Sequence, residues 1–514
     1  MNEEIQKKDT IPKARSIDWL IALGLFLLFT VVYWLTISKD PTIDSYATAH
    51  WVKSAAQLNW FHPHHLLFSY VCRFVNLVYQ TIFPPLDLLL LLTRCMHILG
   101  GLGVGLFYLR LYALNVPRFK AASIAILMGT GYGMWLFSTI FELVMPYYVM
   151  FLAAWAAAHR WGQTKRRGAF AAGMVLGAGV LIHQSLVIYL PAFLIFIFML
   201  GDRPTRWQRA LCHLIGCATV ICAGYIMAFV VLGLEFPAGC YHFFTTYAQS
   251  EAFEHGTLFD VITSGRVIMS VWLYPILYAD QLSFRFTAAM VVLITFVLSA
   301  IYRTVKKDLV STFCLTVFAT AFVFFTWWSP ATLDFYLIPA VMIVLPMLLW
   351  IRLRLFPLLL LVVSLWLVFL NNLPEIRLHA EPQVNCVLET DRDLKDMLKP
   401  QDRVFWANQL LDACAAYVEM PVKCDFVVKD FNEAEKMSLF SKSVKNSYSY
   451  SVYFDASFFE MVTQSGMLTS DEELALLMRD ARIALQIQTS SKSIIIWKIQ
   501  RDIPGNQPDF LVSG

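Results

Sequence analysis

The chain of 514 residues is too apolar for an ordinary soluble protein. Hydrophobic residues make up 58% of it, charged residues only 15%, and its mean hydropathy is +0.59. A single soluble core cannot bury this much apolar surface, so lipid must surround a large part of the chain. The formal net charge of +3 is too small to indicate binding to nucleic acid. The composition therefore predicts a polytopic integral membrane protein.

Eleven apolar runs are long enough to predict membrane-spanning helices. The first run follows several basic residues and has no small-residue cleavage site after it, which is typical of a retained signal anchor with a cytoplasmic N-terminus. The predicted spans are 19–38, 86–114, 121–140, 144–160, 169–182, 185–200, 210–232, 286–302, 309–328, 335–350 and 356–371.

Clusters of basic residues occur at every second connection between these runs. The positive-inside rule places them in the cytoplasm, and an odd number of spans then puts the C-terminal tail outside. The absence of an N-x-[ST] sequon favours a bacterial source, so we expect a bacterial inner (plasma) membrane. The clusters are Arg110/Arg118/Lys120, Arg160/Lys165/Arg166/Arg167, Arg203/Arg206/Arg209, Arg303/Lys306/Lys307 and Arg352/Arg354.

Two further apolar segments, 63–83 and 261–279, would break the alternation of charge if either one crossed the membrane. We interpret both as helices in or near the outer interface. The first ends at Pro84-Pro85, where a helix must stop before the next span. The outer face then carries two large loops, 39–85 and 235–285.

The composition becomes that of a soluble protein after residue 371. Residues 1–371 are therefore predicted to form the transmembrane module, and 372–514 a small exoplasmic α/β domain. Strands are expected at 404–407, 426–428 and 494–499, and a capping box at Ser470 predicts a late helix. Cys414 and Cys424 are the favoured disulfide partners there.

Three polar features occur in order along the outer connections. The first outer loop begins with Asp44-Ser45-Tyr46 and continues to His62-Pro63-His64-His65. Glu142 follows the third predicted span. The fifth span is rich in glycine (Gly173, Gly177 and Gly179) and ends at His183-Gln184.

In this order the features resemble the GT-C superfamily, which includes protein O-mannosyltransferases, the aminoarabinose transferase of lipid A and oligosaccharyltransferases. In that superfamily the first outer loop begins with an Asp and continues to a basic-Pro step, which Asp44 and His62-Pro63 match; His64-His65 replace the usual second Pro. Glu142 and the glycine-rich fifth span match two further features. The resemblance covers roughly residues 19–371. It implies sugar transfer from a polyprenyl-phosphate-linked donor to a protein, lipid or glycan acceptor at the outer face.

Two carboxylates are candidate catalytic groups. An acceptor hydroxyl is a poor nucleophile at neutral pH, so a carboxylate must take its proton as the sugar bond forms. Asp44 is the candidate base, and the alternative is that it caps a helix starting near Ser45. Glu142 is the second candidate, in an apolar and aromatic setting, with a water-exposed loop carboxylate as the alternative.

The leaving polyprenyl phosphate gathers negative charge, so nearby cations and N–H donors lower the barrier. The histidines could instead pack at the interface, or bind a divalent metal with Asp44, because imidazole and carboxylate suit zinc. Adjacent histidines on one helix point about 100° apart, which disfavours a shared ion. The candidates for contact with the donor phosphate or lipid are His62, His64, His65, Arg94, Lys53 and Arg285.

Arg94 and His97 lie three residues apart in the second span, and Asp87 precedes them by about two turns. Charged groups at membrane depth normally face a partner or a wet cavity. An Asp87–Arg94 structural pair and a donor-phosphate role for Arg94 both remain open. Residues that could line the site are Ser45, Tyr46, His97 and His183.

Two other functions compete with sugar transfer. A transporter or flippase would also be polytopic, but those folds usually show paired repeats, which this sequence lacks. A non-enzymatic scaffold with an exoplasmic binding domain would explain the tail without chemistry at Asp44.

Overall fold

The structure is a computed structural model. The residues that it describes are 15–39, 41–53, 61–162, 165–200, 204–241, 243, 257, 260–276, 283–352, 354–367, 372–380, 386–399 and 402–406, with 411, 414–415, 418, 422, 424–426, 440, 452–455, 458, 482–488 and 493–499 in the terminal part. They form two compact units. Unit 1 comprises Met1–Ser38 and Trp51–Leu378, and unit 2 comprises Lys39–His50 and His379–Gly514. The predicted division at residue 371 stays a prediction.

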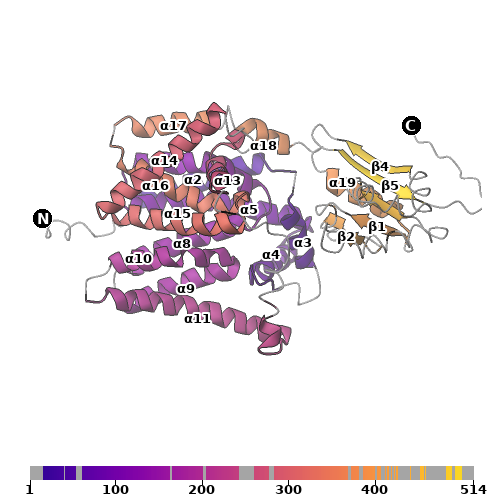
Figure 1. Ribbon diagram of the computed structural model, residues 1–514, viewed down its shortest axis with the longest axis horizontal. Coiled ribbons are helices and arrows are strands. Elements are labelled where there is room, and N and C mark those ends of the chain that lie inside the picture. The colour runs from indigo at the N-terminus through magenta and orange to yellow at the C-terminus, as the bar shows by residue number, and fades with distance from the viewer. Residues whose placement is uncertain are drawn as a thin grey trace, which may run out of the picture. The chain divides into compact units, whose positions relative to one another are not determined.

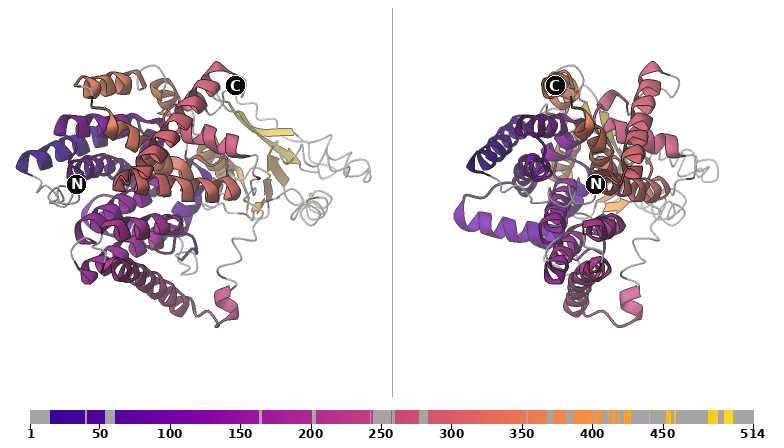
Figure 2. Two further views of the ribbon diagram at one scale, coloured as in Figure 1. Left: turned by 60° about the vertical axis from the view of Figure 1, so that its left-hand side comes forward. Right: turned by 90° about the vertical axis from the view of Figure 1, so that its left-hand side faces the viewer.

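Unit 1 is a bundle of helices (Figures 1 and 2). Its apolar helices run beside one another, as the two views in Figure 2 also show. The helices of the bundle and its connections are α2 (Ser16–Leu35), α4 (Phe68–Ile82), α5 (Leu88–Ala113), α6 (Arg118–Thr130), α7 (Tyr132–Thr139), α8 (Val144–Trp161), α9 (Arg166–Ile182), η2 (Gln184–Tyr189), α10 (Leu190–Leu200), α11 (Arg206–Leu232), α13 (Val261–Ser270), η4 (Tyr274–Ile276), α14 (Phe284–Val305), α15 (Leu309–Trp328), η5 (Leu333–Tyr336), α16 (Leu337–Trp350) and α17 (Phe356–Trp366). Two helices include residues of both units, α3 (Ile43–Lys53) and α18 (Leu373–Ala380).

Within the described residues, six helical segments are long and apolar enough to cross a membrane. They are α2, α5, α11, α14, α15 and the continuous run Leu333–Trp350. In the most apolar 18-residue stretch of α11, and likewise of α14, only 22% is buried inside the protein. This is expected of helices that face lipid. The chain is thus a polytopic α-helical membrane protein, as predicted. The number of eleven spans stays a prediction, because several predicted spans form shorter helices here.

The third predicted span, 121–140, is not one straight helix. It breaks at Gly131 into α6 and α7, which bend by 63°. The break frees backbone groups that need new partners at this depth. The N–H of Gly133 donates to the carbonyl of Val271 at 2.8 Å, and the amide of Asn372 donates to the carbonyl of Thr130 at 2.9 Å. The end of α13 and the residue before α18 therefore stabilise the break.

Helices α9 and α11 lie side by side (Figure 1), and glycines on each of them face the backbone of the other. A Cβ atom on Gly173 would lie 2.0 Å from the carbonyl oxygen of His213. A Cβ atom on Gly216 would lie 2.1 Å from the carbonyl oxygen of Phe170. Small residues at such contacts let two backbones approach and gain dispersion energy. The glycine-rich fifth span therefore sets the position of α11 beside α9.

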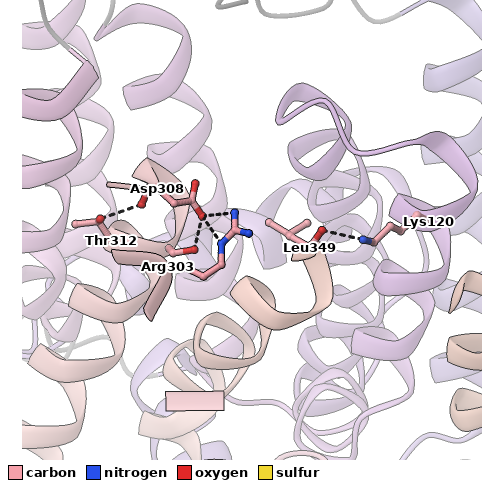
Figure 3. A network of polar contacts seen from close by, with 6 residues as sticks. Lys120, Arg303, Asp308, Thr312 and Leu349 are labelled. Carbon is pink, nitrogen blue, oxygen red and sulfur yellow. Dashed lines mark hydrogen bonds and ion pairs between the residues drawn. The ribbon is translucent and has the colours of Figure 1, made fainter. Parts of the chain in front are cut away.

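Residues of the predicted cytoplasmic clusters make polar contacts at helix ends (Figure 3). The ammonium of Lys120 donates to the carbonyls of Leu349 and Ile351 at 2.9 and 2.7 Å, at the C-terminal end of α16. A cation there satisfies carbonyls that lack partners inside the helix. Arg303 pairs with Asp308 at 2.9 Å, between α14 and α15. These contacts tie together the helix ends that carry the basic clusters.

Unit 2 contains a five-stranded sheet in the order β2-β1-β3-β5-β4. Strand β1 is parallel to β2 and β3, and β5 is antiparallel to β3 and β4. Helix α19 (Cys386–Met397) packs against β4 and β5. The strands are β1 (Arg403–Trp406), β2 (Cys424–Phe426), β3 (Val452–Asp455), β4 (Arg482–Gln488) and β5 (Ser493–Ile499).

Strands β1, β2 and β5 overlap the predicted strands. Strands β3 and β4 were not predicted. Strand β3 is only four residues long and follows a polar, serine-rich stretch. All four of its residues are buried, and Phe454 packs against Phe440 and Phe458. The helix predicted from Ser470 and the side chain of Cys424 lie outside the described part of the chain, so the pairing with Cys414 stays a prediction.

Candidate functional site

The polar stretch of the first outer loop forms a tight turn. The N–H of His65 donates to the carbonyl of His62 at 3.0 Å, and the N–H of Leu67 donates to the carbonyl of Leu181 at 2.9 Å. Helix α4 begins only at Phe68, so the prediction that Pro63 opens this helix is wrong. The 100° separation expected for adjacent histidines on a helix therefore does not apply. Phe61 and Leu66, which flank the turn, pack with Leu181 and Ala228 in one apolar cluster.

Four imidazole rings meet at this turn, and we call them the histidine cluster: His62, His64, His65 and His183. The ring centroids of His62 and His65 are 4.9 Å apart and nearly parallel. Those of His65 and His183 are 5.1 Å apart, and those of His62 and His64 are 5.6 Å apart. His183 comes from the end of α9, so the cluster joins the first outer loop to the fifth predicted span.

Hydrogen bonds fix the tautomers of three rings in the cluster. The Nδ1 atom of His183 accepts from the N–H of Ser185 at 3.2 Å, and that of His64 accepts from the side-chain amide of Gln184 at 2.7 Å. The Nδ1 atom of His62 accepts from the backbone N–H of His64 at 3.3 Å. An imidazole that accepts through Nδ1 carries its proton on Nε2. These three rings therefore present Nε2–H groups as donors.

The cluster is neutral at physiological pH. Burial, with repulsion from His64, lowers the pKa of His62 to about 3, and burial lowers the pKa of His64 to about 4. Burial and the neighbouring histidines lower the pKa of His183 to about 3 and hold the pKa of His65 well below its usual range. The histidines thus offer hydrogen-bond donors rather than fixed positive charges.

Aromatic rings extend the cluster on both sides. The ring of Trp51 stacks on His62 at 5.2 Å and 15°. The ring of Tyr147 lies 5.0 Å from His183, and its hydroxyl donates to the carbonyl of Asp334. The hydroxyl of Tyr225 donates to the carbonyl of Pro63 at 2.6 Å. Tyr147 and Tyr225 were not among the predicted site residues. The available signal was a phenolic hydroxyl inside an apolar span, because such a group needs a partner.

Glu142 lies in the short connection between α7 and α8. Glu142 is only 8% exposed, so the alternative of a water-exposed carboxylate is wrong. The preceding ring of Phe141 stacks on Phe68 with centroids 5.8 Å apart. Phe68 is the first residue of α4 and comes directly after the turn that carries the histidines. The structure therefore brings the connection that carries Glu142 against the base of that turn.

Asp44 lies in the first turn of α3, but it does not cap this helix. The N–H of Ser45 donates to the Thr42 hydroxyl, and the N–H of Thr42 donates to the Ser45 hydroxyl, both at 3.2 Å. Water can reach the Asp44 side chain, yet the protein atoms around it raise the pKa of its carboxyl through loss of hydration. Asp44 belongs to unit 2, so its closeness to the histidine cluster stays a prediction.

The other residues predicted for the site differ in how deeply they are buried. Ser45 and Tyr46 are fully buried, whereas Lys53 and Arg285 are exposed, at the end of α3 and the start of α14.

Arg94 and His97 form their own group around Trp34. The guanidinium of Arg94 lies 4.7 Å from the centre of the Trp34 ring, and the His97 ring lies 6.1 Å from it. The Nδ1–H of His97 donates to the carbonyl of Ser138 at 2.6 Å and links α5 to α7. Asp87 caps α5 by accepting from the N–H of Leu90. These contacts favour a structural role for His97.

A metal site of the predicted kind does not assemble among the described residues. No three His, Cys, Asp or Glu side chains there come together in an arrangement that could hold a metal ion. The rings of the histidine cluster instead stack on one another and bond to backbone and amide donors.

No protein-family model matches the sequence, and no curated protein is significantly similar to it. Solved structures do resemble the fold. ArnT from Cupriavidus metallidurans bound to undecaprenyl phosphate matches with a TM-score of 0.52 at 12% identity, and its apo state with 0.54 at 13%. Each match covers 92% of this chain and 97% of ArnT. This chain shares the fold of ArnT.

The predicted resemblance is thereby confirmed at the level of the fold. The S. cerevisiae protein O-mannosyltransferase Pmt1-Pmt2 complex bound to the sugar donor also matches, with a TM-score of 0.36 at 15% identity, over 43% of this chain and 34% of that chain.

Proposed function

We propose that this chain is a glycosyltransferase that moves a sugar from a polyprenyl-phosphate-linked donor to an acceptor at the outer face of the membrane. The histidine cluster is the observation that carries the proposal, because it gathers N–H donors suited to a phosphate group. The GT-C-like fold supports it, since ArnT, which shares this fold, was solved bound to undecaprenyl phosphate. In this proposal the N-terminus is cytoplasmic, and unit 2 is periplasmic or extracellular.

The cluster is suited to a leaving group that gains charge during the reaction. As the bond between the sugar and phosphate breaks, negative charge develops on the phosphate oxygen. Neutral Nε2–H groups can donate to that oxygen without the desolvation cost of buried cations. Gln184 and the backbone N–H of Ser185 hold His64 and His183 in the donor tautomer beforehand, so little reorganisation is needed.

Asp44 is the proposed general base. The acceptor oxygen bonds to the anomeric carbon, the bond from that carbon to the phosphate oxygen breaks, and the acceptor proton passes to Asp44. A raised carboxyl pKa favours this role, because a base with a pKa nearer the working pH transfers protons more effectively. Asp44 shares α3 with Trp51, whose ring stacks on His62.

Glu142 is proposed as a second carboxylate of the site that orients the acceptor hydroxyl. Its burial beside Phe141 supports this, because a buried carboxylate binds hydroxyl groups strongly. Unit 2 is proposed to contribute to acceptor recognition or assembly. Its described strands supply apolar packing around Phe405 and Phe454.

The test measures binding of undecaprenyl phosphate and transfer from a panel of polyprenyl-phosphate sugars to defined acceptors. His183→Asn removes the donor at the Nε2 position, whereas His183→Gln places an amide N–H close to it. We expect about a tenfold loss of undecaprenyl phosphate affinity for the Asn variant and a smaller loss for the Gln variant, because a hydrogen bond to a charged group is lost. Wild-type binding in both variants, or no transfer by the wild-type protein to any acceptor, would contradict the proposal.

A further inference from the structure

An apolar groove lies between α10 and α11, near the ends joined by residues 201–205. It has a volume of about 410 Å³. Trp207 and Leu211 on its α11 side are 72% and 55% exposed, so the groove opens away from the protein core toward lipid. Its lining consists of Leu194, Ile195, Phe198, Trp207, Ala210, Leu211 and Leu214.

A positively charged side chain lies at the end of this groove. Arg206 is the first residue of α11, and its guanidinium lies 4.5 Å from the centre of the Phe198 ring. The Trp207 ring packs edge-on against the same Phe198 ring, with centroids 4.6 Å apart. A guanidinium over an aromatic face is held electrostatically in a fixed position. Arg206 is thus oriented next to the apolar groove.

The cation has no acidic counterpart nearby in the described structure. Within the described residues no carboxylate forms an ion pair with Arg206, and its Nε atom is buried without a hydrogen-bond partner. The segment 160–209 contains seven Arg and Lys residues and one acidic residue, Asp202. The helix ends around the groove therefore carry an excess of positive charge, which calls for an anion.

We infer that this groove binds one anionic phospholipid, with an acyl chain between α10 and α11 and its phosphate at Arg206. The apolar lining suits a hydrocarbon chain, and a fixed cation at the membrane interface suits a lipid phosphate. A neutral lipid could fill the groove equally well, but it would leave the excess positive charge uncompensated. Charge complementarity therefore distinguishes the anionic lipid from bulk lipid.

The test compares lipid binding to the purified full-length protein in detergent by native mass spectrometry. Phosphatidylglycerol and phosphatidylcholine with the same acyl chains are titrated in parallel. We expect phosphatidylglycerol to bind more tightly, and Arg206→Gln to reduce this preference about fivefold, since each basic residue contributes on this scale. Arg206→Lys should keep most of the preference. Ala210→Trp, which fills the groove, should weaken both lipids.

Arg354→Gln is the matched control. It removes one exposed positive charge from the connection before α17, so the headgroup preference should stay at the wild-type value. Equal binding of the two lipids by the wild-type protein would overturn the inference. So would an unchanged preference in Arg206→Gln, an equal loss in Arg354→Gln, or stronger competition by undecaprenyl phosphate than by phosphatidylglycerol at this groove.

Discussion

The side-chain amide of Gln184 lies 2.7 Å from Nδ1 of His64, and the N–H of Gln184 donates to the carbonyl of His64 at 2.9 Å. One residue just beyond α9 therefore holds the histidine turn by two hydrogen bonds. The first bond sets the tautomer of His64, and the second sets the position of its backbone. The end of α9 thereby fixes a loop that is far away in the sequence.

Replacing Gln184 should alter phosphate binding through His64. Gln184→Leu removes the amide that donates to Nδ1, so the Nε2–H tautomer is no longer imposed, and we expect undecaprenyl phosphate affinity to fall about fivefold to tenfold. Gln184→Glu should instead favour a protonated His64 and raise its pKa, so binding should strengthen as the pH falls from 8 to 6. Titration followed by tryptophan fluorescence measures both. Identical pH profiles for Gln184→Glu and the wild type would contradict the role given to Gln184.

Acidification should destabilise the helical unit through the histidine cluster. The pKa values of about 3 for His62 and about 4 for His64 lie below the ordinary value near 6.5, so the unfolded chain binds more protons between those pH values. The free energy of unfolding therefore rises with pH up to about 6.5 and falls as the pH drops from 6.5 toward 4. The slope is at most about 1.4 kcal/mol per pH unit for each histidine that stays neutral.

Thermal unfolding of the purified protein between pH 7 and pH 5 checks this dependence. His64→Gln removes one titrating group and should flatten the loss of melting temperature on acidification. An equally steep loss in that variant would show that other groups cause the acid sensitivity.

Because α9 packs closely against α11, adding one methyl group at their contact should strongly lower the stability of the protein. In Gly173→Ala the new Cβ atom would lie 2.0 Å from a backbone oxygen of α11, so the two helices must separate. We expect a loss of about 1–3 kcal/mol in stability, typical of overpacking. Gly24→Ala in α2 is the control, because nothing lies within 4 Å of its new Cβ atom. A melting temperature for Gly173→Ala equal to that of Gly24→Ala would contradict the predicted clash.

Hydropathy predicted the apolar character of the bundle, because spanning helices need long apolar runs whatever their neighbours are. It could not predict the break at Gly131, since Val271 and Asn372 supply the partners that the break requires. Both partners lie more than a hundred residues further along the chain. Helix bounds that depend on such distant partners cannot be read from local sequence.

The candidate site shows the same limit. The sequence indicated His62, His64, His65 and His183 one at a time, from a His-Pro step and a helix end. It could not show that His65 and His183 are neighbours, because this depends on how α9 packs against the first outer loop. It also expected Asp44 as a possible helix cap, a role that Thr42 and Ser45 perform in the structure.

The membrane orientation can be tested with reporters. The alternating basic clusters predict that a reporter fused after Arg167 or Lys307 lies in the cytoplasm, whereas one fused after Asn372 lies outside. Alkaline phosphatase and green fluorescent protein fusions report the two sides. A cytoplasmic signal from the fusion after Asn372 would place unit 2 on the wrong side for the proposed chemistry.

The proposed base predicts a loss of rate without a loss of donor binding. Asp44→Asn keeps the size and hydrogen bonding of the side chain but cannot accept a proton, so sugar transfer should slow by about 10²-fold or more. Undecaprenyl phosphate affinity should change much less, because the donor contacts are assigned to the histidine cluster. Transfer rates and lipid affinities of purified wild-type and Asp44→Asn protein measure the two effects separately.

The pH profile distinguishes a base from a structural carboxylate. Because the pKa of Asp44 is raised, its protonated form persists to a higher pH than for an ordinary Asp near 3.9, and transfer should rise with pH as this proton is lost. Asp44→Glu should retain such a rise, and Asp44→Asn should lose it. Glu142→Gln, which removes the other carboxylate, should weaken acceptor use but keep the rise. Near-normal turnover in Asp44→Asn would rule out this mechanism, and loss of the rise in Glu142→Gln alone would assign the base to the connection between α7 and α8.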